Sequence, residues 1–68
     1  MLGIEERTAP QGKFRMIGVD TFDNSDWVEK DFSDRKEAIE IASIRGGVML
    51  KMYVYDDQGK CIFQSGTY

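Results

Sequence analysis

Histidine is absent from this 68-residue chain, and cysteine and proline occur only once each. Without histidine there is no histidine-based catalytic triad or dyad and no Cys/His zinc site. A single cysteine cannot build a disulfide framework, and one free thiol suits a reducing, cytoplasmic setting. These absences lead us to expect a cytoplasmic protein with no metal and no cofactor.

Long apolar runs are also missing. Residues 1–4 are followed by Glu5 and Glu6, and no basic residue precedes them, so we expect neither a signal peptide nor a transmembrane helix. A 7.8 kDa chain can bury only about 60% of its surface, which allows one thin core. We expect residues 1–12 to be an N-terminal tail and residues 13–68 to form a single domain.

The acidic charge lies in one stretch. The net charge is −3, which argues against a protein that binds nucleic acid by neutralising phosphates. Residues 20–34 contain one lysine, Lys30, and six carboxylates: Asp20, Asp23, Asp26, Glu29, Asp31 and Asp34. Their spacing is not that of a calcium loop. The stretch is typical of a solvated loop, and the alternative is a docking face for a basic protein.

The hydrophobic pattern predicts four strands and one helix. The strand-like segments are residues 13–22, 27–32, 48–56 and 60–65. Asp34 or Ser33 can cap a helix over Arg35–Arg45, and Gly46 with Gly47 predicts a left-handed stop. The order β-β-α-β-β predicts an α+β fold, with a single antiparallel sheet of three to four strands and one helix packed on one face.

Two turns set the expected strand registers. A two-residue loop at Asn24 and Ser25 would pair Phe22 with Trp27. A three-residue loop that ends at Gly59 would give four pairs between the last two strands. These pairs are Val54 with Ile62, Met52 with Gln64, Tyr55 with Cys61 and Tyr53 with Phe63.

These registers sort the strand residues onto two faces of the sheet. The mostly aliphatic set, expected to receive the helix, is Ile17, Val19, Val28, Phe32, Val48, Leu50, Met52, Val54 and Ile62. The second set is expected to lie on the uncovered face and to form an interface: Phe14, Met16, Phe22, Trp27, Met49, Tyr53, Tyr55 and Phe63, with Cys61 beside them.

An uncovered aromatic face is larger than the apolar patch that a monomer normally exposes. Three covers remain open: the N-terminal residues Met1, Leu2 and Ile4, a second copy in a twofold dimer, or single-stranded nucleic acid. The other alternative is a strand register that differs by one residue from the expected one. We predict a non-catalytic binding or assembly module that forms a homodimer through this face. The nucleic-acid alternative would use Lys51, Tyr53, Tyr55 and Phe63.

The remaining candidate catalytic residues form no catalytic arrangement in the sequence, so we predict that the protein is not an enzyme. Glu29 and Asp31 could pair for acid–base work, but the chain is too short to build a pocket around them. Cys61 follows Lys60, and on a strand opposite Tyr55 it fits a small packing residue better than a nucleophile.

Two segments carry a resemblance to known proteins. Residues 31–42 (DFSDRKEAIEIA) and 53–62 (YVYDDQGKCI) resemble short bacterial β-β-α-β-β domains of unknown function. In such domains an aromatic residue precedes a capped helix, and a D-x-G-x-x-I hairpin follows. The helix entry also resembles that of HicB-type antitoxins, which bind a toxin and sometimes operator DNA. This second resemblance implies an inhibitor whose acidic residues 20–34 meet a basic partner.

Overall fold

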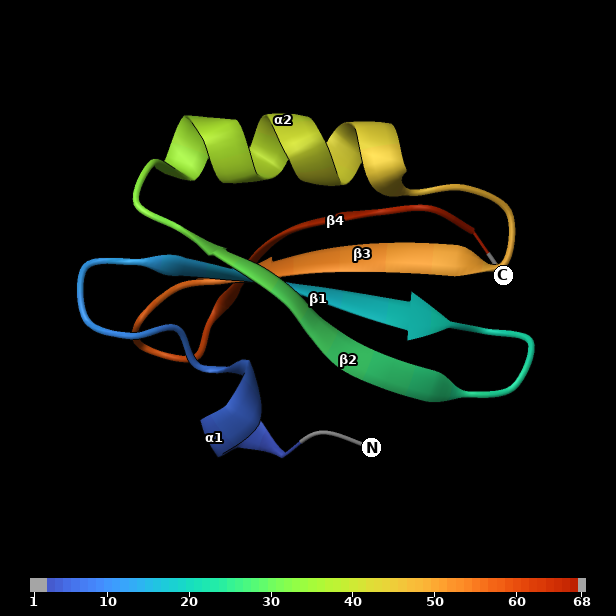
Figure 1. Cartoon of the computed structure of the whole chain (residues 1–68), viewed down its shortest axis with the longest axis horizontal. Coiled ribbons are helices and arrows are strands. Elements are labelled where there is room, and N and C mark those ends of the chain that lie inside the picture. Colours follow the sequence, from blue (N-terminus) through green and yellow to red (C-terminus); the bar gives the residue numbers. More distant parts are fainter. Residues whose placement is uncertain (1–2, 68) are drawn as a thin grey trace.

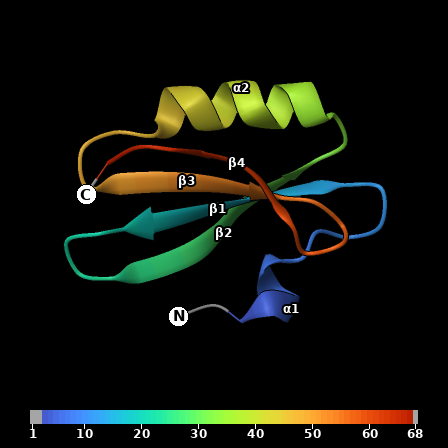
Figure 2. The same cartoon turned by 180° about the vertical axis from the view of Figure 1, so that it is seen from behind.

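The computed structural model describes residues 3–67, apart from the side chain of Ile4. One antiparallel sheet has the strand order β2-β1-β3-β4. The strands are β1 (Phe14–Asp20), β2 (Ser25–Phe32), β3 (Leu50–Tyr55) and β4 (Cys61–Ser65). α2 (Arg35–Arg45) packs on one face, and the single turn α1 (Ile4–Arg7) lies on the opposite side (Figure 1, Figure 2). The predicted α+β architecture is confirmed, and α1 lies within the segment predicted as a tail.

α2 begins and ends at residues that explain its bounds. Asp34 is the N-cap, and its carboxylate accepts a hydrogen bond of 2.9 Å from the Lys36 backbone N–H. Gly46 ends the helix by donating its N–H to the Ala42 carbonyl, with φ −65°. The expected left-handed stop is therefore wrong. Gly46 is instead a point of close approach, since a Cβ there would collide with Ser65.

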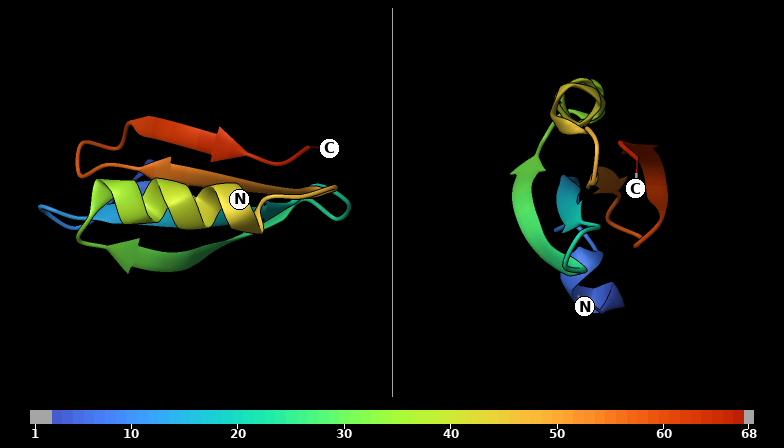
Figure 3. Two further views of the ribbon diagram at one scale, coloured as in Figure 1. Left: turned by 90° about the horizontal axis from the view of Figure 1, so that it is seen from above. Right: turned by 90° about the vertical axis from the view of Figure 1, so that its right-hand side faces the viewer.

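The core lies between α2 and the sheet. Ala38 and Ala42 are fully buried on the helix, and their small side chains bring it close to the strands. Beneath them lies a cluster of four buried side chains: Met16, Phe32, Met52 and Val54. Figure 3 shows the resulting layers, with α2 above the sheet, α1 below it, and β2 and β4 at its two edges.

The face of β1 that lies toward α2 is the opposite of the one expected from the sequence. Met16 pairs with Val54, and both belong to the core cluster under α2. Ile17 pairs with Tyr53 and therefore points to the other face. The grouping of Ile17 with Val54 is wrong because the pairing of β1 with β3 is a long-range contact that no turn specifies.

The β1–β2 hairpin also differs from its expected register. Asp20 pairs with Ser25 around a four-residue turn, residues 21–24, in which Asn24 has φ 61°. Further along, Met16 pairs with Lys30 and Ile17 with Val28, so Glu29 forms a bulge. The expected pairing of Phe22 with Trp27 is wrong, since Trp27 lies opposite Gly18.

A second bulge changes the last hairpin. Tyr55 pairs with Cys61 as expected, but Val54 then pairs with Phe63 because Ile62 is the extra residue. The expected pairs beyond Tyr55 are therefore wrong. Phe63 turns toward α2 and packs against the core cluster instead of lying beside Tyr53.

Candidate functional site

The face of the sheet opposite α2, here called the open face, is organised in three rows across the strands. Directly paired residues of antiparallel strands point to the same face. The middle row contains Val28, Ile17, Tyr53 and Gln64. The row nearer α1 contains Asp31, Arg15, Tyr55 and Cys61. The row nearer the β1–β2 turn contains Asp26, Val19 and Lys51.

A bidentate ion pair anchors the row nearer α1. Arg15 Nε lies 2.7 Å from Asp31 Oδ1, and Arg15 Nη2 lies 3.0 Å from Asp31 Oδ2. The hydrogen bond from Arg15 lowers the pKa of Asp31, although partial burial acts in the opposite direction. Arg15 also donates to the Glu6 carbonyl at 2.9 Å, which ties α1 to this row.

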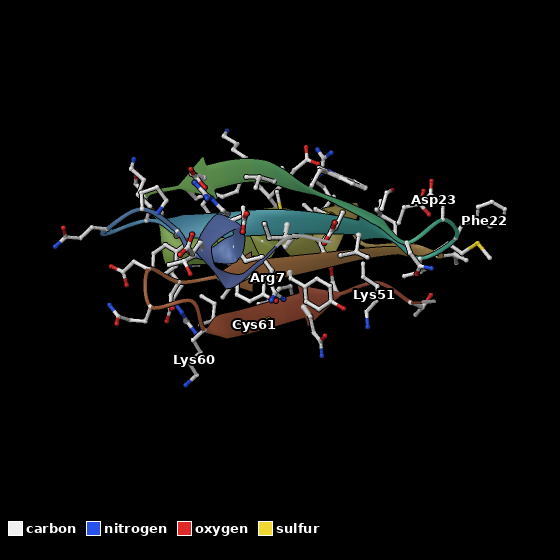
Figure 4. The ribbon with its side chains drawn as sticks, turned by 90° about the horizontal axis from the view of Figure 1, so that it is seen from below. Arg7, Phe22, Asp23, Lys51, Lys60 and Cys61 are labelled. Carbon is white, nitrogen blue, oxygen red and sulfur yellow. The ribbon has the colours of Figure 1, made fainter. Side chains whose placement is uncertain are left out.

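Two tyrosines on β3 form the aromatic part of the open face. The ring centroids of Tyr53 and Tyr55 lie 6.5 Å apart. Arg7 donates to the Tyr55 hydroxyl at 3.1 Å and lies 5.4 Å from its ring centroid. Lys51 Nζ lies 5.5 Å from the Tyr53 ring centroid, so each tyrosine has a neighbouring cation. Figure 4 shows Arg7, Lys51 and Cys61 on this face.

A groove of about 360 Å³ runs along the open face between α1 and the β1–β2 turn. Its apolar lining comes from Ile17 and Val19, with the two tyrosines beside them. Thr21 lies at the far end, where its buried Oγ1 has no hydrogen-bond partner among the described residues. The groove therefore combines an apolar centre with polar groups at its ends, as binding sites do.

The residues expected to form one interface are divided among three places. Only Tyr53 and Tyr55 lie on the open face. Four lie on the α2 side: Phe14, Met16, Trp27 and Phe63. Phe22 and Met49 lie at the turns at one end of the sheet, where Met49 has φ 61° and its carbonyl accepts from the Thr21 N–H. Phe22 is 78% exposed there (Figure 4).

Sequence reasoning missed the residues that occupy the open face instead. The sequence predicts Ile17, Val19 and Val28 on the side covered by the helix and Arg7 in the tail, whereas the first three lie on the open face and Arg7 lines its groove. The alternation along β1 correctly indicated that Ile17 and Val19 share a face. It contained no signal for which of the two faces α2 would cover.

The carboxylates of residues 20–34 have partners within the chain. Asp20, Asp23 and Asp34 accept hydrogen bonds from backbone N–H groups in turns or at the helix cap. The Ser25 hydroxyl also donates to Asp23, and this bond is the main cause of its lowered pKa. Glu29 accepts from the Trp27 indole at 2.8 Å and lies 3.0 Å from Arg45 Nη2. These structural roles account for much of the acidic stretch, and the basic-partner hypothesis stays a prediction.

Other candidate chemistry is sparse in the part of the chain that the structure describes. Cys61 is exposed, and its Sγ lies 3.4 Å from the Phe63 carbonyl. Within residues 3–67 no group of three His, Cys, Asp or Glu side chains could hold a metal ion. No helix in the same range has the length and apolar character needed to cross a membrane.

Comparison with protein families, characterised proteins and solved structures found no match for this chain. The resemblances to short bacterial β-β-α-β-β domains and to HicB-type antitoxins therefore stay predictions. The candidate site rests on its geometry alone.

Proposed function

We propose that this protein is a non-catalytic, cytoplasmic binding and assembly module that forms a homodimer through its open face. The observation that carries the proposal is the unequal cover of the two sheet faces. α2 lies along one face, whereas the one-turn α1 meets the other at Arg7 and Arg15. Within the middle row Val28 is 40% exposed, whereas its partner on β1, Ile17, is buried.

The arrangement of charge on the open face supports a second copy as the occupant. The apolar residues of the middle row, Val28 and Ile17, are flanked by two charged pairs, which are Arg15 with Asp31 on one side and Lys51 with Asp26 on the other. An apolar centre with a charged rim is the usual anatomy of a protein interface. Because each rim contains both signs of charge, two copies related by a twofold axis can place opposite charges against each other.

The decisive experiment introduces a charge into the middle row. Val28→Asp is expected to weaken self-association by at least about tenfold, because a carboxylate would be desolvated at the centre of the interface. Val48→Asp is the matched control, since Val48 is 82% exposed and lies outside the open face. Sedimentation equilibrium measures both, and circular dichroism confirms that each variant folds. Equal association of the two variants, or a monomeric parent protein, would contradict the proposal.

A second candidate function is the binding of single-stranded nucleic acid. The observation that favours it is the pairing of Arg7 with Tyr55 and of Lys51 with Tyr53, because stacking platforms for bases combine aromatic rings with cations. Tyr53→Ala combined with Tyr55→Ala should then abolish the fluorescence anisotropy change of a labelled oligonucleotide while self-association persists. If the double variant instead loses self-association and the parent protein binds no oligonucleotide, the homodimer is favoured.

A further inference from the structure

We infer that the outer edge of β4 is a second assembly surface, which pairs antiparallel with β4 of another copy of this chain. The sheet order leaves two strands at the edges, β2 and β4. An edge strand presents unpaired N–H and C=O groups, which form a template for a further strand. The two edges differ in how far their side chains oppose such pairing.

β2 carries the charges by which natural proteins protect an edge. Its sequence SDWVEKDF contains Asp26, Glu29, Lys30 and Asp31. The sequence of β4, CIFQS, contains no charged residue and no proline. Each of these strands has one bulge, at Glu29 and at Ile62, so bulges do not distinguish the two edges. The charged side chains distinguish the two edges, because β2 has four of them and β4 has none. β4 is therefore the edge that can accept a partner strand.

The same charges favour β4 of a second copy as the occupant. Pairing of β2 with β2 of another copy would bring together two edges that each have three carboxylates and one lysine. Pairing of β4 with β2 of another copy would leave free edges at both ends and grow without closing. Two copies of β4 place no like charges opposite each other, and antiparallel pairing about a twofold axis closes at two copies.

The surface beside β4 also has room for a neighbouring strand. A shallow groove of about 500 Å³ lies along the strand. It is lined by Tyr53, Tyr55, Cys61, Ile62, Phe63 and Gln64. Side chains of a paired strand would lie in this groove while the backbones form the ladder, which is the usual mode of strand addition.

The β4 edge goes beyond the proposed open-face dimer because it would bind through backbone N–H and C=O groups, although four side chains beside it also belong to the open face: Tyr53, Tyr55, Cys61 and Gln64. A chain with two self-complementary surfaces assembles further than a dimer, and each contact can be removed alone. In Val28→Asp the open-face contact is disrupted, so the association that survives reports on β4. The first residue of β4, Cys61, and the first residue of β2, Ser25, are both exposed and form a matched pair for substitution.

The test follows backbone amide exchange in Val28→Asp as protein concentration rises. Amide exchange in β4 is expected to slow at least about tenfold with concentration, while exchange in β2 stays constant, because only paired edges gain hydrogen bonds. Adding Cys61→Lys should remove the concentration dependence, since a lysine opposes edge pairing. Adding Ser25→Lys should leave it intact. Circular dichroism confirms that each double variant is folded.

Each outcome separates the inference from the proposed function. If association is lost in Val28→Asp and exchange in β4 never depends on concentration, the β4 edge is refuted and the open-face dimer stands. If association is lost in Cys61→Lys but unchanged in Val28→Asp, the open-face dimer is refuted and the β4 edge stands. Slower exchange in β2 as well, with polymers that grow without limit, means pairing of β2 with β4 and overturns the inference. A monomer in every variant overturns both.

Discussion

The indole of Trp27 lies directly against the backbone of Gly18 on the neighbouring strand. A Cβ atom built on Gly18 would be 2.6 Å from Cε2 and Cζ2 of the Trp27 ring. The indole N–H also donates to Glu29, which in turn pairs with Arg45 on α2. The glycine thus leaves space for a large ring against the sheet, and the Glu29 contacts connect this ring to the end of α2.

Gly18→Ala is therefore expected to displace the Trp27 ring. We expect the free energy of unfolding to fall by about 1–3 kcal/mol, the usual cost of overpacking, with a shift of tryptophan fluorescence toward longer wavelength. Gly47→Ala is the control, because a Cβ there meets nothing within 4 Å. Denaturation followed by tryptophan fluorescence measures both variants. An equal loss in the two would show that backbone entropy rather than the ring is responsible.

Met16→Ala tests the corrected orientation of β1. Met16 is 1% exposed and packs under α2, so its truncation should lower the free energy of unfolding by about 2–5 kcal/mol. Phe22→Ala removes a larger side chain that is 78% exposed and should change stability by no more than about 0.5 kcal/mol. Urea denaturation compares them. A Met16→Ala variant that keeps full stability would contradict the orientation.

Asp34→Ala tests which residue caps α2. Loss of the hydrogen bond to the Lys36 N–H should lower the free energy of unfolding by about 1 kcal/mol. Ser33→Ala should have a smaller effect, because the Ser33 hydroxyl accepts from Lys13 Nζ on an exposed surface. Thermal denaturation by circular dichroism measures the two variants. The reverse order of effects would make Ser33 the cap.

The Arg15–Asp31 pair predicts a loss of stability in acid. Arg15 lowers the pKa of Asp31 in the folded state below the unfolded value of about 3.9. The stabilisation is therefore fully present above that value and is lost as the pH falls through the folded pKa. The side chains are 20% and 31% exposed, so Asp31→Asn should cost about 1 kcal/mol at neutral pH.

The same variant should cost little at a pH below the folded pKa, where Asp31 is protonated in the parent protein as well. Glu40→Gln, on the exposed side of α2, controls for a general change in net charge. Urea denaturation at neutral and acidic pH gives the comparison. A cost for Asp31→Asn that is the same at both pH values would contradict this assignment.

Local patterns predicted the four strands and α2 correctly, but not α1. The strand runs, the cap at Asp34 and the turn before Gly59 act within a few residues, so they can be recognised without knowledge of the rest of the chain. The pairing of Tyr55 with Cys61 followed in the same way. In this last hairpin the register fails from Ile62 onward, where a bulge places Phe63 on the other face.

The candidate site could not be predicted in the same way. The sequence predicts Phe14 and Met16 on the same face as Tyr53. In the structure both lie on the α2 side, whereas Tyr53 lies on the open face. Nothing local distinguishes the two orientations of β1, since either face of the strand offers apolar side chains to the helix. The space over Gly18 for Trp27 and the fit of Met16 beneath Ala38 and Ala42 depend on contacts between distant segments.

Local patterns in the sequence were enough to predict a small α+β fold in which α2 covers one face of an antiparallel sheet. Which residues α2 covers depends on long-range strand pairing, because a one-residue change of register exchanges the faces of a strand. This pairing buries Met16 fully and Phe14 partly on the α2 side, and it leaves Ile17, Val28 and Tyr53 on the open face. The proposed binding surface follows from this choice of face.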